Sequence, residues 1–168
     1  LLALYGPLNE QILASEVRLA ALSGTDPIVR LLNTAPGVGP VTAAAFVSTI
    51  DDITRFESAH HVEAYLGLVP SEGSSAERRR LGHITKAGNS RMRWLLVEVA
   101  WCILRSKSSE TAALRAWTGL IAARRGNRIA TVALARRMAG ILFAMWRDGA
   151  AYDATKIRMP RGAVVRPI

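Results

Sequence analysis

The 168-residue sequence contains few cysteines, few aromatic residues and few acids. Its single cysteine, Cys102, excludes an internal disulfide and a zinc site built from cysteines. We expect Cys102, which lies in the apolar run 94–104, to be a core residue of a protein from a reducing compartment. Aromatic residues make up 6% of the chain, which disfavours a β-sandwich, whereas abundant alanine favours packed helices.

Long hydrophobic runs are also missing. No segment reaches the roughly 18 consecutive apolar residues of a membrane span, since Glu98 interrupts the best one. No signal peptide is recognisable. The sequence therefore predicts a cytoplasmic protein without membrane contact. The chain starts at Leu1 instead of methionine, within a helical pattern, so we expect it to be part of a longer protein.

The charge is strongly asymmetric. Lysine and arginine total 22 residues against 13 acids, a formal charge of +9, and nearly all of the excess is arginine. Because guanidinium groups bind phosphates in a bidentate manner, this excess predicts a polyanionic partner. The alternative is a charge that only keeps the protein soluble.

Apolar residues recur at intervals of three and four along most of the chain, as on one face of an α-helix. Asp26-Pro27 marks the start of one helix, and Asn89 or Ser90 caps another. These signals predict an all-α fold with a helix-hairpin-helix unit, an arginine-rich loop segment and a helical bundle. A short hairpin within 67–88, with Leu81–Thr85 as one strand, is the exception. The expected helices are 1–22, 28–34, 41–50, 59–66, 110–124, 127–147, and one from residue 89 through 103.

Four regions follow from this pattern. Residues 1–25 form an amino-terminal helix whose one-sided apolar face also suits the tail of a coiled coil, and we expect a homo-oligomer. Residues 26–110 form the main domain with the helix-hairpin-helix, and 111–150 form a helical extension. Residues 151–168 form a loose basic tail.

The most informative local pattern reads Ala-Pro-Gly-Val-Gly-Pro-Val-Thr-Ala at 35–43, between two short helices. One glycine suits a positive φ after the first helix, and the next leaves room for close approach of a ligand to the backbone. Amides at the start of the second helix then form a small anion site. The alternative is an ordinary tight turn between helices. We expect a backbone phosphate to contact this hairpin at Gly37, Val38, Gly39, Pro40 and Thr42.

A second pattern combines serines with arginines. Residues 78–93 contain six basic side chains and no acid. A serine beside such a cluster is placed to attack phosphorus while the cations hold the phosphate oxygens. However, serines in a glycine-rich loop usually form turns, and the sequence identifies no base beside Ser74 or Ser75. The expected phosphate-holding residues are Arg78, Arg79, Arg80, Lys86, Arg91 and Arg93.

Several blocks occur in a fixed order over about 31–105. This ordered set resembles the carboxy-terminal domain of the insertion-sequence one-ten (also called one-sixteen) family of bacterial transposases. The blocks are Pro-Gly-Val-Gly-Pro-Val-Thr-Ala at 36–43, Arg-Phe at 55–56, Ala-Tyr-Leu-Gly-Leu-Val-Pro-Ser at 64–71, Ser-Ser at 74–75, and Gly-His-Ile-Thr-Lys-Ala-Gly-Asn-Ser-Arg-Met-Arg-Trp-Leu-Leu-Val-Glu at 82–98.

The resemblance implies DNA transposition by serine-type recombination. It implies Ser75 as the nucleophile, with Ser74 as the second choice, and a covalent phosphoserine link to DNA. Ala76 stands where the family commonly has glycine. It further implies a RuvC-like acidic domain that binds magnesium outside these residues, a guide RNA, and a bacterial protein associated with the nucleoid when bound. We expect no cofactor in this stretch, and no recombination by this stretch alone.

Other polar residues point to no additional chemistry. His60, His61 and His83 lack the spacing of metal ligands, and Asp51 and Asp52 read as helix-end residues. We therefore expect no metal ligand in this chain. Three other interpretations remain: a non-enzymatic helix-hairpin-helix DNA-binding module, an inactive transposase remnant, and an RNA scaffold that acts through charge alone.

Overall fold

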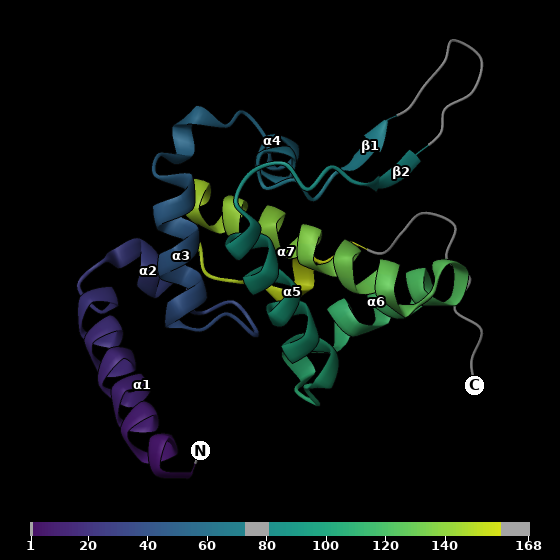
Figure 1. The fold of residues 1–168 in the computed structure, drawn as a ribbon. Coiled ribbons are helices and arrows are strands. Elements are labelled where there is room, and N and C mark those ends of the chain that lie inside the picture. The colour runs from purple at the N-terminus through teal and green to yellow at the C-terminus, as the bar shows by residue number, and fades with distance from the viewer. Residues whose placement is uncertain (1, 73–80, 159–168) are drawn as a thin grey trace.

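Helix α7 (Asn127–Asp148) lies at the centre of the fold, with α5 (Ser90–Arg105), α6 (Ala112–Arg125) and α4 (Ala59–Tyr65) packed against it (Figure 1). The computed structural model describes residues 2–72 and 81–158. The prediction of an all-α class is confirmed, since the described residues contain one short two-stranded sheet beside the helices. The remaining helices are α1 (Leu2–Ser23), α2 (Pro27–Leu32) and α3 (Pro40–Ile50), with short 3-10 turns at Ile53–Arg55, Ser109–Thr111 and Ala154–Lys156.

The buried face of α7 is wider than the single apolar face expected from its sequence. Leu134, Met138, Leu142 and Phe143 are fully buried, and Trp146 contacts Phe46 of α3 with ring centroids 6.4 Å apart. Truncation of one such side chain to alanine costs about 2–5 kcal/mol. One core thus includes residues from both the predicted main domain and the predicted extension.

The apolar character of α7 also bears on the membrane prediction. Among the described residues it is the one helix long and apolar enough to cross a membrane, with a mean hydropathy of 1.4. Arg136 and Arg137 interrupt its apolar residues, so the expectation that no segment has about 18 consecutive apolar residues holds, but the most apolar segment is α7 and not the one that Glu98 interrupts. Half of the apolar stretch is buried by neighbouring helices, so its composition is accounted for by its place in the core.

Helix α5 follows its sequence signals closely. The Asn89 side chain accepts a hydrogen bond from the Met92 amide at 3.0 Å, which confirms the predicted cap. The predicted apolar face is buried, but Cys102 is exposed, so its assignment to the core was wrong. The error arose because 94–104 was read as one apolar run, whereas a helix of this length exposes one side, here including Trp94 and Trp101.

Two elements stand away from this core (Figure 1). Strands β1 (Pro70–Glu72) and β2 (Leu81–Ile84) form an antiparallel ribbon in which Pro70 pairs with Ile84 and Glu72 with Leu81. Helix α1 projects on the other side, where it contacts α3, and its apolar residues are exposed, Leu4 by 70% and Tyr5 by 71%. The coiled-coil and homo-oligomer expectations remain predictions.

Residues 150–158 pack on the body instead of forming a loose tail. Tyr152 and Ile157 lie against the core, and Nη2 of Arg137 donates to the Arg158 carbonyl at 2.9 Å. Burial raises the pKa of Tyr152 and lowers that of Arg137. The rest of the predicted tail lies outside the described residues.

Candidate nucleic-acid interface

The loop between α2 and α3 is fixed by its glycine and its valine. Gly37 has φ +75°, and an added Cβ would lie 3.1 Å from the Val99 carbonyl oxygen of α5. Val38 is buried beneath the turn, and its amide donates to the Ala35 carbonyl at 3.1 Å. The loop is therefore seated against α5, which holds the start of α3 in one orientation.

The start of α3 offers free amides. Gly39 is the N-cap, with no side-chain cap, and Pro40 follows at the first helical position. In the described part of the chain, the amides of Val41 and Thr42 have no acceptor outside the helix. Gly39 has no heavy atom within 4 Å of an added Cβ, so the approach to these amides is open on that side. An anion placed here meets amide groups and the positive end of the helix.

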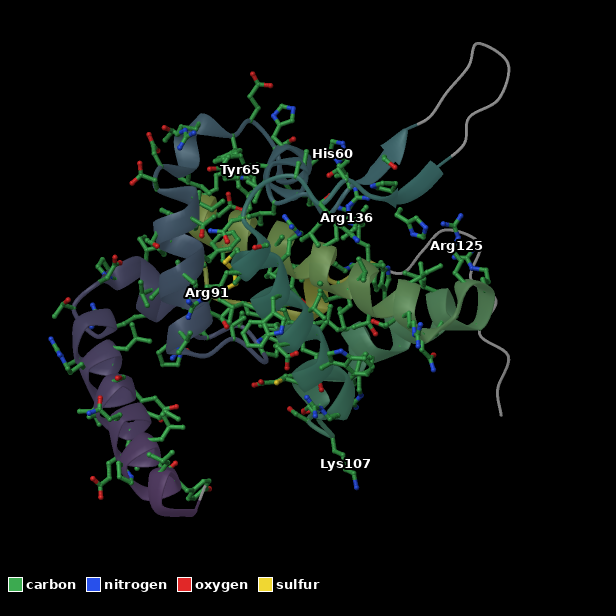
Figure 2. All side chains as sticks on the ribbon, in the orientation of Figure 1. His60, Tyr65, Arg91, Lys107, Arg125 and Arg136 are labelled. Carbon is green, nitrogen blue, oxygen red and sulfur yellow. The ribbon has the colours of Figure 1, made fainter. Side chains whose placement is uncertain are left out.

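One predicted cation lies beside this helix start. Arg91, in the first turn of α5, is exposed and lines a shallow pocket together with Val41. The other wall of that pocket is α1, through residues that include Gln11 and Ser15. Figure 2 shows Arg91 on the side of the molecule where α3 lies. Arg91 and the hairpin can therefore contact neighbouring phosphates.

The root of the ribbon is a close crossing of two backbone segments. An added Cβ at Gly88 would overlap the Tyr65 carbonyl oxygen, and one at Gly67 would overlap Ala87. Both glycines have positive φ, +68° at Gly67 and +75° at Gly88. The Lys86 amide donates to the Gly67 carbonyl at 3.1 Å. The ribbon leaves the body at a position that only these two glycines permit.

Arg93 ties this crossing together. Its Nη1 donates to three carbonyl oxygens, of Ala87 at 2.6 Å, Gly88 at 3.1 Å and Leu66 at 3.2 Å. The side chain was expected to hold phosphate, but this nitrogen is directed at protein backbone. Arg93 therefore holds the root of the ribbon, and its expected phosphate contact remains a prediction for its other nitrogens.

The other residues expected to contact phosphate or act on DNA lie either at the ribbon root or outside the described residues. Lys86 is exposed at the ribbon root with φ +56°. The serines and arginines expected to act on DNA lie outside the described residues, in the segment 73–80 that joins the two strands; they are Ser74, Ser75, Arg78, Arg79 and Arg80. The structure thus brings Arg91 to the hairpin, whereas the ribbon lies on another side of the body (Figure 1).

One histidine and one aspartate of this group, His60 and Asp52, have side-chain contacts within the protein. Nε of Arg136, on α7, donates to Oε2 of Glu63 on α4 at 2.5 Å, and Nη2 lies 3.2 Å from Nδ1 of His60 (Figure 2). Asp52 caps the turn after α3. Its carboxylate accepts hydrogen bonds from the hydroxyl and the amide of Thr54, and these bonds lower the pKa of Asp52. Within the described residues, 2–72 and 81–158, no group of three His, Cys, Asp or Glu side chains could hold a metal ion.

Sequence reasoning missed the pairing of Gly67 with Gly88. The available signal was a glycine on each side of a predicted hairpin, a position where close backbone approach is common. It also missed α1 as the wall facing Arg91, because contacts between distant helices leave no local pattern.

Comparison with known proteins places these features in a family. Residues 29–116 match the model of the transposase IS116/IS110/IS902 family. This range includes both the helix hairpin and the ribbon.

Individual relatives agree with this match. A transposase for insertion sequence element IS1111A of Coxiella burnetii is 33% identical over 137 residues, which cover 82% of this chain and 38% of the relative. The insertion element IS110 uncharacterized 43.6 kDa protein of Streptomyces coelicolor is 32% identical over 154 residues, covering 92% of this chain and 36% of the relative. The chain spans about two fifths of the length of these curated relatives.

Proposed function

The chain belongs to the IS116/IS110/IS902 transposase family, and on this basis we propose that it is the DNA-contacting, serine-bearing part of a transposase that acts by serine-type recombination. In this proposal the helix hairpin binds the DNA backbone and the β1–β2 ribbon carries the nucleophile. The observation on which the proposal mainly rests is the ribbon itself. Its strands end at Glu72 and begin again at Leu81, and the segment between them contains Ser75 and three arginines.

The hairpin supports the DNA contact. Its loop is seated on α5 through Gly37, its amides at Val41 and Thr42 are free within the described chain, and Arg91 lies beside them. Such a site recognises phosphate and carries no base specificity. We therefore propose that the hairpin positions the backbone and that sequence choice comes from elsewhere, with a guide RNA as the proposed source.

The ribbon root fixes where the two described strands leave the body. The crossing at Gly67 and Gly88 and the hydrogen bonds of Arg93 join both strands to α5. The Ser71 hydroxyl donates to the His83 carbonyl at 2.9 Å, which ties the two strands together within the ribbon. A nucleophile carried on such a support reaches its target with less loss of conformational entropy.

The proposed chemistry is a phosphoryl transfer to Ser75. The serine Oγ forms a bond to a backbone phosphorus as one phosphorus–oxygen bond to deoxyribose breaks. The released sugar hydroxyl takes up a proton, and the serine gives one up. Guanidinium groups of Arg78, Arg79 and Arg80 would neutralise the charge that develops on the phosphate oxygens. Ser74 is the second choice.

Magnesium does not fit the residues that the structure describes. Its usual ligands are carboxylate oxygens, and within those residues no cluster of three metal-binding side chains exists. The described side chains therefore take no part in metal binding in this mechanism. We place magnesium in the acidic domain expected outside the chain, so this chain alone is proposed to bind DNA without recombining it.

Excision of the element in cells tests the proposed nucleophile. Ser75→Ala in the full-length protein should abolish excision, whereas the matched variant Ser74→Ala should retain it. The protein level of each variant is measured in parallel. Excision by Ser75→Ala at the unaltered level, with DNA binding retained, would instead favour a non-enzymatic DNA-binding module for this chain.

A further inference from the structure

Seven arginines and no acid occur between Glu110 and Asp148. This run lies mostly outside the family match and contains none of the residues considered so far as phosphate ligands. Like charges on packed helices repel one another, and either a partner within the protein or an external anion relieves this repulsion. The contacts of the seven divide them into two groups.

Four of the seven have partners within the protein. Arg115 donates to the Ser106 carbonyl, and Arg136 pairs with Glu63. The guanidinium carbon of Arg137 lies 4.5 Å from the ring centroid of Trp117, and Arg147 pairs with Asp148 at 2.7 Å. The guanidinium groups of these four thus have contacts within the protein.

The other three arginines gather at the corner where α6 ends and α7 begins. Arg124 and Arg125 form the last turn of α6, and Arg128 lies in the first turn of α7, with Gly126 at φ +82° between the helices. All three are exposed, and for none of them do the described residues supply a hydrogen bond, ion pair or ring contact. Figure 2 shows Arg125 at the end of the helix pair.

The position of this corner relative to the hairpin is set by α7. The corner lies at the start of α7, and the other end of α7 reaches α3, where Trp146 contacts Phe46 (Figure 1). A helix of 22 residues is about 33 Å long at 1.5 Å per residue. The corner is thus well separated from α3, the helix that begins at the hairpin loop.

We infer that Arg124, Arg125 and Arg128 form a second contact for a sugar–phosphate backbone, separate from the helix hairpin. This inference rests on the proposed DNA contact of the hairpin. Its ligand is the phosphate backbone of a double helix, which either DNA or the paired regions of an RNA supply. Arginine suits this role because its planar fork binds two phosphate oxygens at once.

The test compares two triple variants of the full-length protein with equal charge change. Arg124→Gln/Arg125→Gln/Arg128→Gln removes the corner, and Arg55→Gln/Arg105→Gln/Lys107→Gln removes three exposed cations elsewhere. Thermal unfolding checks that both remain folded. Binding is measured over a range of salt concentrations with a duplex of about 20 base pairs, made of DNA or of RNA.

For the corner variant we expect affinity for the duplex to fall about tenfold or more, and the slope of log affinity against log salt to fall by about three units, one for each lost contact. The control variant should keep the slope. A loss of affinity for the DNA duplex, for the RNA duplex or for both supports the contact and identifies which nucleic acid supplies the backbone.

Equal losses for the two triple variants would overturn the inference, because charge alone would then explain the binding. Gly39→Asp reports on the hairpin separately. If it weakens binding while the corner variant does not, the second contact fails and the proposed function stands. If the corner variant alone weakens binding, the proposed hairpin contact fails.

Discussion

The helix hairpin and the ribbon root both depend on glycines with positive φ, but the two regions are attached to the body differently. Gly37 turns the chain so that the loop lies against α5, and Val38 fills the space beneath it. Gly67 and Gly88 instead allow two backbone segments to cross, and Arg93 holds them through polar contacts. The hairpin loop is therefore held mainly by apolar packing, whereas the ribbon root adds the hydrogen bonds of Arg93 to the apolar packing of Leu68 and Ile84. Substitutions should affect them unequally.

The largest expected effect is at the crossing. Gly88→Ala should destabilise the protein by about 3 kcal/mol or more, because the Cβ overlaps the Tyr65 carbonyl and φ is positive. Gly67→Ala should behave similarly. Urea unfolding measures this loss.

A matched control is Gly119→Ala in α6, where an added Cβ meets nothing within 4 Å. It should leave stability unchanged or raise it by up to about 1 kcal/mol. Equal stability of Gly88→Ala and Gly119→Ala would contradict the crossing as described.

The next effect is at Arg93. Arg93→Gln removes the donor shared by Leu66, Ala87 and Gly88, and we expect a loss of about 2 kcal/mol. Hydrogen exchange should accelerate at the Thr85 and Lys86 amides, which bond across the root. Arg91→Gln, an exposed neighbour on the same helix, should change stability by less than about 0.5 kcal/mol. Unchanged hydrogen exchange at both amides would show that Arg93 does not stabilise the ribbon root.

A smaller effect is expected at Gly37. Gly37→Ala introduces a positive-φ residue whose Cβ lies 3.1 Å from the Val99 carbonyl oxygen and 3.2 Å from Cγ1 of Ile103. The expected loss is about 1–2 kcal/mol, less than at Gly88 because these contacts need only a small shift. Thermal unfolding of Gly37→Ala and Gly88→Ala ranks their losses of stability. A larger loss for Gly37→Ala would contradict the expected order.

The smallest effect on stability, but a large one on binding, is expected at Gly39. Asp at this N-cap accepts the Val41 and Thr42 amides, which should raise stability by up to about 1 kcal/mol. It also places a negative charge where the phosphate should lie, so affinity for DNA should fall. Gly39→Ala adds the same Cβ without the charge and should bind normally. Equal DNA affinities of Gly39→Asp and Gly39→Ala in a binding titration would show that the hairpin does not contact DNA.

The parts of the structure that local signals determine could be predicted from the sequence. Asp26 and Asn89 cap their helices as expected, and the strand at Leu81–Ile84 was anticipated, because each depends on residues close by in the chain. The role of Arg93 could not be predicted, since it depends on a carbonyl 27 residues away. Cys102 was misplaced because hydrophobicity alone does not tell which side of a helix faces solvent.

The candidate site was predictable to a lesser extent. The order of its motifs indicated the family, and the glycine pattern indicated the hairpin. The association of α1 with Arg91 and the gathering of three unpaired arginines at the α6–α7 corner depend on how helices pack. Packing of this kind arises from contacts distant in sequence, which periodicity does not reveal.

The most direct test of the central claim is to trap the full-length protein on its DNA and identify the linked residue by mass spectrometry. The account predicts a DNA-linked peptide from 73–80 with the phosphate on Ser75, a link that disappears in Ser75→Ala and persists in Ser74→Ala. A covalent link at a residue outside the ribbon, or a link that survives Ser75→Ala at full yield, would contradict it.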